Sequence, residues 1–125
     1  MPYKMKALKF MKKAVELYKA ENPKGENLFF LSEFYLWAAR AAKEGGFKEE
    51  AKDLAIAGFD LIPDDYEKYE SCLPMLEQML GGLYTIIGNY TQAEIHLKRA
   101  LESRKCDYCI HGYCIDACYE MIHLC

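Results

Sequence analysis

The sequence lacks any long hydrophobic run and contains few residues that interrupt helices. No stretch approaches the roughly 20 consecutive apolar residues that a transmembrane helix needs. Residues 1–17 alternate Lys with apolar residues, whereas a secretion signal has an unbroken apolar core. Only 4 of the 125 residues are Pro. These absences predict a globular, cytoplasmic protein with no membrane partner.

Motifs for catalysis are also missing. The sequence has no Gly-rich phosphate-binding loop and no nucleophile motif. Its three His residues, at positions 96, 111 and 123, stand apart, and we interpret His96 as a surface or packing residue. We therefore expect a binding protein and not an enzyme.

Charge is unevenly distributed, which the net charge of −3 conceals. Residues 1–25 carry seven Lys against two Glu, a net charge of +5, whereas the other 100 residues carry a net charge of −8. This acidic body argues against a nucleic-acid partner. The basic helix could meet an anionic membrane or an acidic partner, but we favour an ordinary solvated face, because a membrane would repel the acidic remainder.

Between its turn signals, the sequence spaces apolar residues as helices do. Turns are indicated near positions 22–25, 45–46, 62–65, 88–89 and 105–107. They divide the chain into about six helices and no strands, and the short turns predict antiparallel neighbours. The predicted helices cover about residues 3–20, 27–44, 47–61, 72–87, 91–104 and 108–125.

Local signals support these helices. Pro74 lies in a first turn, where its missing N–H does no harm. Thr91 and Glu94 have the spacing of a capping box, in which each side chain bonds to the other residue's N–H. Lys residues lie off the apolar stripe of the first helix. That stripe consists of Ala7, Leu8, Met11, Ala14, Val15 and Tyr18.

Two stretches, 44–52 and 87–94, share a pattern of Gly, an aromatic residue and Ala. The Gly permits a tight turn between helices, and the small Ala lets the second helix pack closely on the first. Ala51 and Ala93 are 42 residues apart. The pattern predicts a repeat of helical hairpins.

The second copy resembles the tetratricopeptide repeat (TPR) family, and residues 88–102 look like the long-period repeats of kinesin light chains. The matching residues are Leu80, Gly81 and Tyr84 in the first helix, and Gly88, Tyr90, Ala93, Leu97 and Ala100 in the turn and second helix. The resemblance implies an all-α fold of antiparallel helix-hairpin repeats, a TPR-like α-solenoid of about six helices in one domain, 1–125. We expect a half repeat at 3–20, repeats at 27–63 and 72–104, and a terminal helix at 108–125.

The resemblance also implies a function, because TPR proteins usually bind a peptide or helix of a partner protein in a groove lined by first helices. Carried over to this sequence, the groove residues are Trp37, Arg40, Lys43, Gln78 and Thr85. Aromatic residues at helical spacing usually pack inside, so for Trp37 we favour a core position. Arg40 and Lys43 are also typical of a solvated face.

The C-terminal segment holds five of the six Cys. Cys106 and Cys109 have metal-ligand spacing, and Cys114 and Cys118 would share a helix face, so four thiolates could hold zinc or an iron–sulfur cluster. Cys is also a small apolar residue that buries readily. We favour packing without a cofactor. Metal binding, with zinc as the first candidate, and thiol redox sensing are the alternatives.

The last predicted helix is apolar on nearly all sides, so it must be buried against another surface. We expect that surface in a homodimer or in the partner, with contacts through Tyr113, Tyr119 and Ile122. Taken together, the residues predict a protein–protein interaction module that forms a homo-oligomer.

Overall fold

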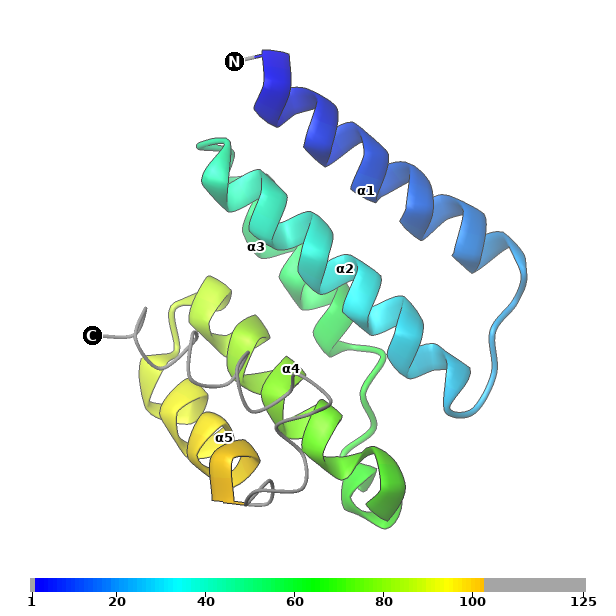
Figure 1. The fold of residues 1–125 in the computed structure, drawn as a ribbon, viewed down its shortest axis with the longest axis vertical. Coiled ribbons are helices and arrows are strands. Elements are labelled where there is room, and N and C mark those ends of the chain that lie inside the picture. Colours follow the sequence, from blue (N-terminus) through cyan, green and yellow to red (C-terminus); the bar gives the residue numbers. More distant parts are fainter. Residues whose placement is uncertain (1, 103–125) are drawn as a thin grey trace. The chain divides into compact units, whose positions relative to one another are not determined.

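The computed structural model describes residues 2–102 (Figure 1). Over this range the chain forms 5 α-helices and two short 3₁₀-helices, and it contains no β-strand. The predicted all-α class is confirmed. The predicted terminal helix at 108–125 lies outside the described residues. No helix in the described range is long and apolar enough to cross a membrane.

The chain divides into two compact units, Met1–Pro63 and Asp64–Cys125. The first contains α1 (Pro2–Ala20), α2 (Asn27–Glu44) and α3 (Lys48–Phe59). The second begins with the 3₁₀-helices η1 (Tyr66–Lys68) and η2 (Glu70–Cys72) and continues with α4 (Leu73–Ile87) and α5 (Tyr90–Glu102). The five α-helices begin and end within about two residues of the predicted positions.

Two glycines follow α2 and α4 in equivalent turns. Gly46 has a backbone φ of +86° and Gly88 a φ of +98°, a left-handed conformation that residues with a Cβ rarely adopt. The N–H of Gly88 bonds to the carbonyl oxygen of Tyr84 at 2.9 Å, which closes the last turn of α4. Gly46 and Gly88 are 42 residues apart, so both turns follow the period seen in the sequence.

The start of α5 differs from the prediction. The helix begins at Tyr90, so Thr91 lies inside its first turn and not in front of it. Asn89 precedes the helix, and its Oδ1 accepts a hydrogen bond from the backbone N–H of Gln92 at 3.3 Å. The predicted capping box is wrong because Asn, among the strongest N-cap residues, already occupies the position next to the turn. Glu94 pairs instead with Lys98, at 2.8 Å.

In the first unit, α1 packs on α2 along the predicted apolar stripe. Leu8 and Val15 are buried, with exposed fractions of 7% and 6%. The ring of Tyr18 meets the ring of Phe34 on α2 edge-on, with 5.2 Å between the ring centroids. Met11, Ala14 and Tyr18 are half-buried and Ala7 is exposed, so the buried stripe is narrower than predicted.

Small residues line the contact between α2 and α3. The Ser32 hydroxyl on α2 donates a hydrogen bond to the carbonyl oxygen of Gly58 on α3, at 2.7 Å. Ala39 lies two turns after Ser32 on the same side of α2, and it is fully buried, as is Ala55 on α3. Side chains this small let the two helices approach closely.

In the second unit, α4 and α5 achieve the same close packing with a different pair of residues. A Cβ on Gly81 would overlap the side chain of Leu97, so α5 approaches α4 only because Gly81 has no side chain. Leu97 is fully buried. The residues 42 positions earlier are Ala39 and Ala55. One hairpin therefore fills this contact with Gly and Leu, and the other uses two Ala.

Gly81→Ala should destabilise the protein by about 2 kcal/mol, because the new methyl group overlaps Leu97. Leu97→Ala alone should cost about 2–5 kcal/mol through the cavity that it leaves. The double variant recreates the Ala pair of the first unit. Its loss should therefore fall short of the sum of the single losses by about 1 kcal/mol or more. Urea unfolding followed by circular dichroism measures all three. Strictly additive losses would show that the two residues do not share the space.

Candidate functional site

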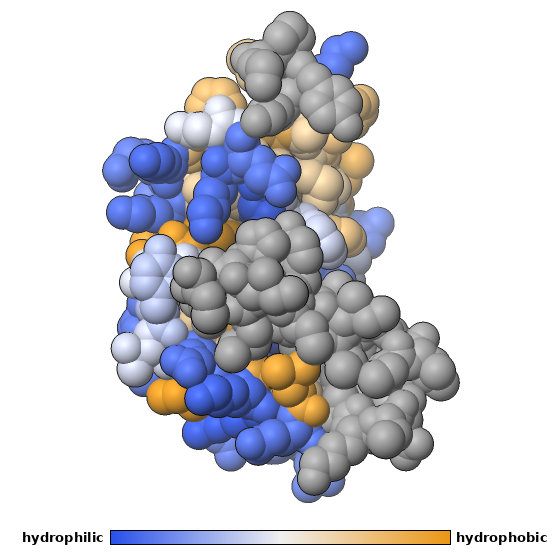
Figure 2. Space-filling model, turned by 60° about the vertical axis from the view of Figure 1, so that its left-hand side comes forward, coloured by the Kyte–Doolittle hydropathy of each residue, from blue (hydrophilic) through white to orange (hydrophobic). Residues whose placement is uncertain are grey.

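Large apolar side chains are exposed on α1 and α2. The exposed fraction is 73% for Phe10 and 60% for Leu17 on α1, and 45% for both Phe30 and Trp37 on α2. In each pair the residues are seven apart, or about two helical turns, so each pair forms a row along its helix. We call these four residues the apolar face. Figure 2 shows hydrophobic side chains exposed among hydrophilic ones on the side of the molecule that it presents.

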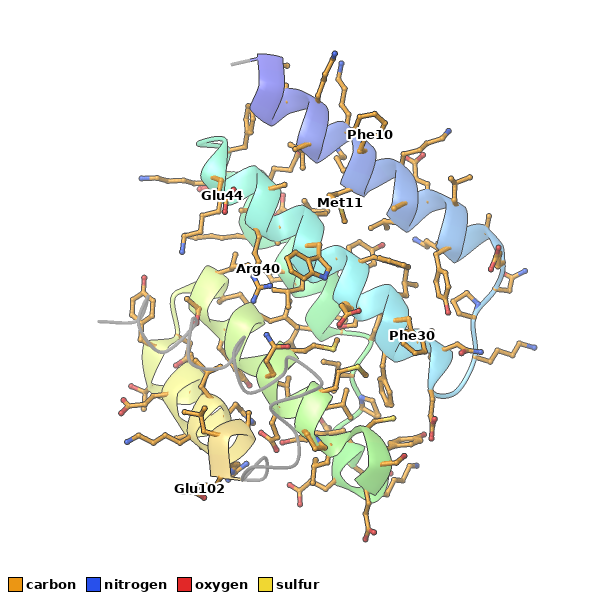
Figure 3. The ribbon with its side chains drawn as sticks, in the orientation of Figure 1. Phe10, Met11, Phe30, Arg40, Glu44 and Glu102 are labelled. Carbon is orange, nitrogen blue, oxygen red and sulfur yellow. The ribbon has the colours of Figure 1, made fainter. Side chains whose placement is uncertain are left out.

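Both rows lie on the side of the first unit that is turned away from α3. Lys12 on α1 bonds to Glu50 on α3 at 3.2 Å, and Ser32 on α2 bonds to α3 as well. At 100° per residue, Phe10 and Leu17 lie about 140–160° around α1 from Lys12. Phe30 and Trp37 lie at the same angles around α2 from Ser32. Figure 3 shows Phe10 on α1 and Phe30 on α2, the helix that lies in front of α3 in this view.

Trp37 carries a charged neighbour on the apolar face. The guanidinium carbon of Arg40 lies over the Trp37 ring at 4.9 Å from its centroid, which is cation–π geometry. With 45% of the side chain exposed, the core position favoured for Trp37 is wrong. Lys43 is exposed as well. It lies about three turns after Ser32, however, and so on the α3 side of the helix. The structure brings Trp37 and Arg40 together without Lys43.

The other two predicted groove residues, Gln78 and Thr85, lie on α4 in the second unit. Both are buried, with exposed fractions of 4% and 6%. The Thr85 hydroxyl donates a hydrogen bond to the carbonyl oxygen of Gly81 one turn earlier, at 2.8 Å. The structure thus places Gln78 and Thr85 in the interior and gives the Thr85 hydroxyl an acceptor within its own helix.

The predicted C-terminal sites lie outside the described residues. The proposed metal ligands there are Cys106, Cys109, Cys114 and Cys118, and the proposed contact residues are Tyr113, Tyr119 and Ile122. Within residues 2–102, no group of three or more His, Cys, Asp or Glu side chains is arranged to hold a metal ion. Cys72, the Cys of this range, is half-buried and free.

A buried polar cluster joins α4, α5 and η1 in the second unit. The carboxylate of Glu77 on α4 lies 2.5 Å from Nδ1 of His96 on α5. Its other oxygen accepts a hydrogen bond from the hydroxyl of Tyr66 on η1, at 2.9 Å. Glu77, His96 and Tyr66 are 4%, 7% and 9% exposed. The Tyr84 ring stacks on the His96 ring, with centroids 5.4 Å apart and planes within 9°.

The cluster borders an open depression of about 450 Å³ lined by Glu67, Leu73, Glu77, Arg99 and Glu102. Arg99, which is half exposed, places Nη1 4.0 Å from the Glu77 carboxylate. Burial, together with the hydrogen bond to Glu77, raises the pKa of the Tyr66 phenol above its ordinary value of 10. Burial also raises the pKa of Tyr84. Both phenols therefore stay neutral to a higher pH than an ordinary Tyr side chain.

The helical hairpin does not require this cluster. The positions 42 residues before Glu77 and His96 are Tyr35 and Leu54. These two residues pack against the apolar core of the first unit, around Val15. The sequence did not reveal the pair: His96 was interpreted as a surface or packing residue, and a single Glu in the apolar stretch 73–87 was the available signal.

No family model, curated protein or solved structure matches the chain. The likeness to TPR repeats therefore rests on the residues and on the shared 42-residue pattern.

His96→Leu should destabilise the protein by about 2–4 kcal/mol, because it removes a partner from the buried Glu77 carboxylate. Adding Glu77→Leu removes that carboxylate, so the double variant should be more stable than His96→Leu alone by about 1 kcal/mol or more. Urea unfolding at pH 7 measures both. If the second substitution only adds to the loss, the two side chains are not coupled.

Tyr66→Phe should change how stability responds to alkaline pH. Because folding raises the pKa of this phenol, the unfolded phenol ionises first. Its contribution is complete below pH 10 and is lost as the pH rises further. The variant has no phenol at this position, so its unfolding free energy should fall less steeply with pH above pH 10. The difference in slope corresponds to the release of up to one proton on unfolding. Urea midpoints measured across this pH range test the slope, and parallel slopes for both proteins would contradict the assignment.

Proposed function

We propose that this protein is a TPR-like interaction module that binds a segment of a partner protein on the apolar face of α1 and α2. We also propose that its helical hairpins form an α-solenoid and that the protein is cytoplasmic. The observation that carries it is the exposure of Phe10, Leu17, Phe30 and Trp37 on one side of the first unit.

Single exposed apolar residues are common on soluble proteins, whereas several gathered on one face favour a binding site. The apolar face combines aromatic rings with an Arg that lies over the Trp37 ring. Trp, Tyr and Arg are the residues that most often dominate the energy of protein interfaces. Burial of these side chains would supply affinity without any reactive group.

The repeat pattern supports the TPR-like part of the proposal. Gly46 and Gly88 follow equivalent helices and adopt the left-handed conformation, 42 residues apart. At the same period, the pair Ala39 and Ala55 corresponds to the pair Gly81 and Leu97. Two hairpins that share turns and contact positions are what repeat architectures are built from.

Substitutions on the apolar face should weaken partner binding while a matched substitution elsewhere should not. We expect Phe30→Ala and Leu17→Ala each to raise the Kd of a partner purified on the wild-type chain by roughly tenfold or more. Ile56→Ala on α3 is the control, since Ile56 is equally exposed, at 47%, and belongs to the same unit. Isothermal titration with each folded variant gives the values.

Two results would refute the docking face. Either the Phe30 and Leu17 variants bind as tightly as the wild type, or Ile56→Ala weakens binding as much as they do. Trp37 is the only Trp in the chain. Its fluorescence therefore reports from the site itself, and a bound partner should shift the emission to shorter wavelength.

A further inference from the structure

The charges that border the apolar face differ between its two edges. On α1, Lys6, Phe10, Lys13 and Leu17 follow one another at intervals of four, three and four residues, so cationic and apolar side chains alternate along a single stripe. Lys6 and Lys13 are both exposed. On α2, the residues beyond Phe30 and Trp37 include both signs, since Arg40 shares its side of the helix with Glu33 and Glu44. The cationic edge is therefore the α1 edge.

The spacing of the apolar residues suits a helix as the ligand. Phe10 and Leu17, like Phe30 and Trp37, are about 10.5 Å apart along their helices, at 1.5 Å per residue. A partner helix lying along α1 and α2 presents its own residues i and i+7 at the same interval. The two rows would flank its apolar side, and the Lys row would meet one of its polar edges.

Resting on the proposed function, we infer that the partner segment is an amphipathic helix with carboxylates along the edge that faces α1. Its apolar residues pack on Phe10, Leu17, Phe30 and Trp37, and its Asp or Glu residues lie beside Lys6 and Lys13. The net charge of +5 in residues 1–25 attracts such a segment. An anionic membrane would attract the same lysines but would repel the remainder of the chain, with its net charge of −8.

A displayed library of amphipathic helical peptides, randomised between acidic and basic residues on both polar edges, tests this inference. Selection uses the full wild-type chain, with Phe30→Ala for counter-selection. We expect the enriched peptides to carry acidic residues along one edge. Enrichment of basic or uncharged edges, or no enrichment at all, would overturn the inference. The docking face would still stand if the Phe30 and Leu17 variants lose the natural partner.

Charge reversal provides the matched control. Lys6→Glu combined with Lys13→Glu should weaken binding of an enriched peptide by roughly tenfold. Lys48→Glu combined with Lys52→Glu, which makes the same change of charge at exposed positions on α3, should weaken it by less than about threefold. Affinity read from Trp37 fluorescence should fall as salt rises. Equal losses for the two double variants would overturn the inference.

A membrane or a second copy of the chain on the apolar face would each give a different experimental result. If the wild-type chain binds phosphatidylserine vesicles and the Lys6 and Lys13 double variant does not, the ligand of this face is a membrane and not an acidic helix. Sedimentation that shows a dimer which Phe10→Ala and Phe30→Ala dissociate would show that the ligand is a second copy of the chain. A monomer that ignores the vesicles and binds the acidic peptide supports the inference.

Discussion

The close approach of paired helices is the constraint on which the described structure depends. A helix has a limited circumference, and α2 uses much of it for contacts with its neighbours. Ser32 and Ala39 serve the contact with α3, and Leu31 belongs to the cluster with Val15 of α1. The bulky residues Phe30 and Trp37 therefore lie on a side that no helix of the first unit covers. The apolar face is exposed because other residues of α2 make the contacts with α1 and α3.

The two units share the packing of a helical hairpin but differ in the side chains that they bury. Around Tyr35 and Leu54 the first unit is apolar, whereas the equivalent positions of the second hold Glu77 and His96. A polar group buried among apolar ones is stable only when its partners are in place, so the cluster ties α4, α5 and η1 to one register. We interpret the cluster as the feature that specifies one packing arrangement for α4, a helix that is otherwise almost wholly apolar.

Local physics made the helices predictable, and contacts across helices made the rest unpredictable. Gly46 and Gly88 marked turns because residues with a Cβ rarely adopt their backbone conformation. Periodicity gave the buried side of α1, but it could not show that Phe10 and Leu17, set among lysines, stay uncovered. Trp37 was misjudged because burial depends on which sides of α2 have neighbours. The pairing of Glu77 with His96 joins residues 19 apart on different helices, which no local pattern encodes.

The 42-residue spacing of the turns also bears on how the chain reaches its fold. In the described range, the main helix contacts join sequence neighbours: α1 with α2, α2 with α3, and α4 with α5. Each contact closes a short loop, so the entropic barrier to forming it is small. Proteins dominated by such local contacts fold in microseconds to milliseconds. The apolar face is composed of residues from the first two helices, so its geometry depends on one of these local contacts, the one between α1 and α2.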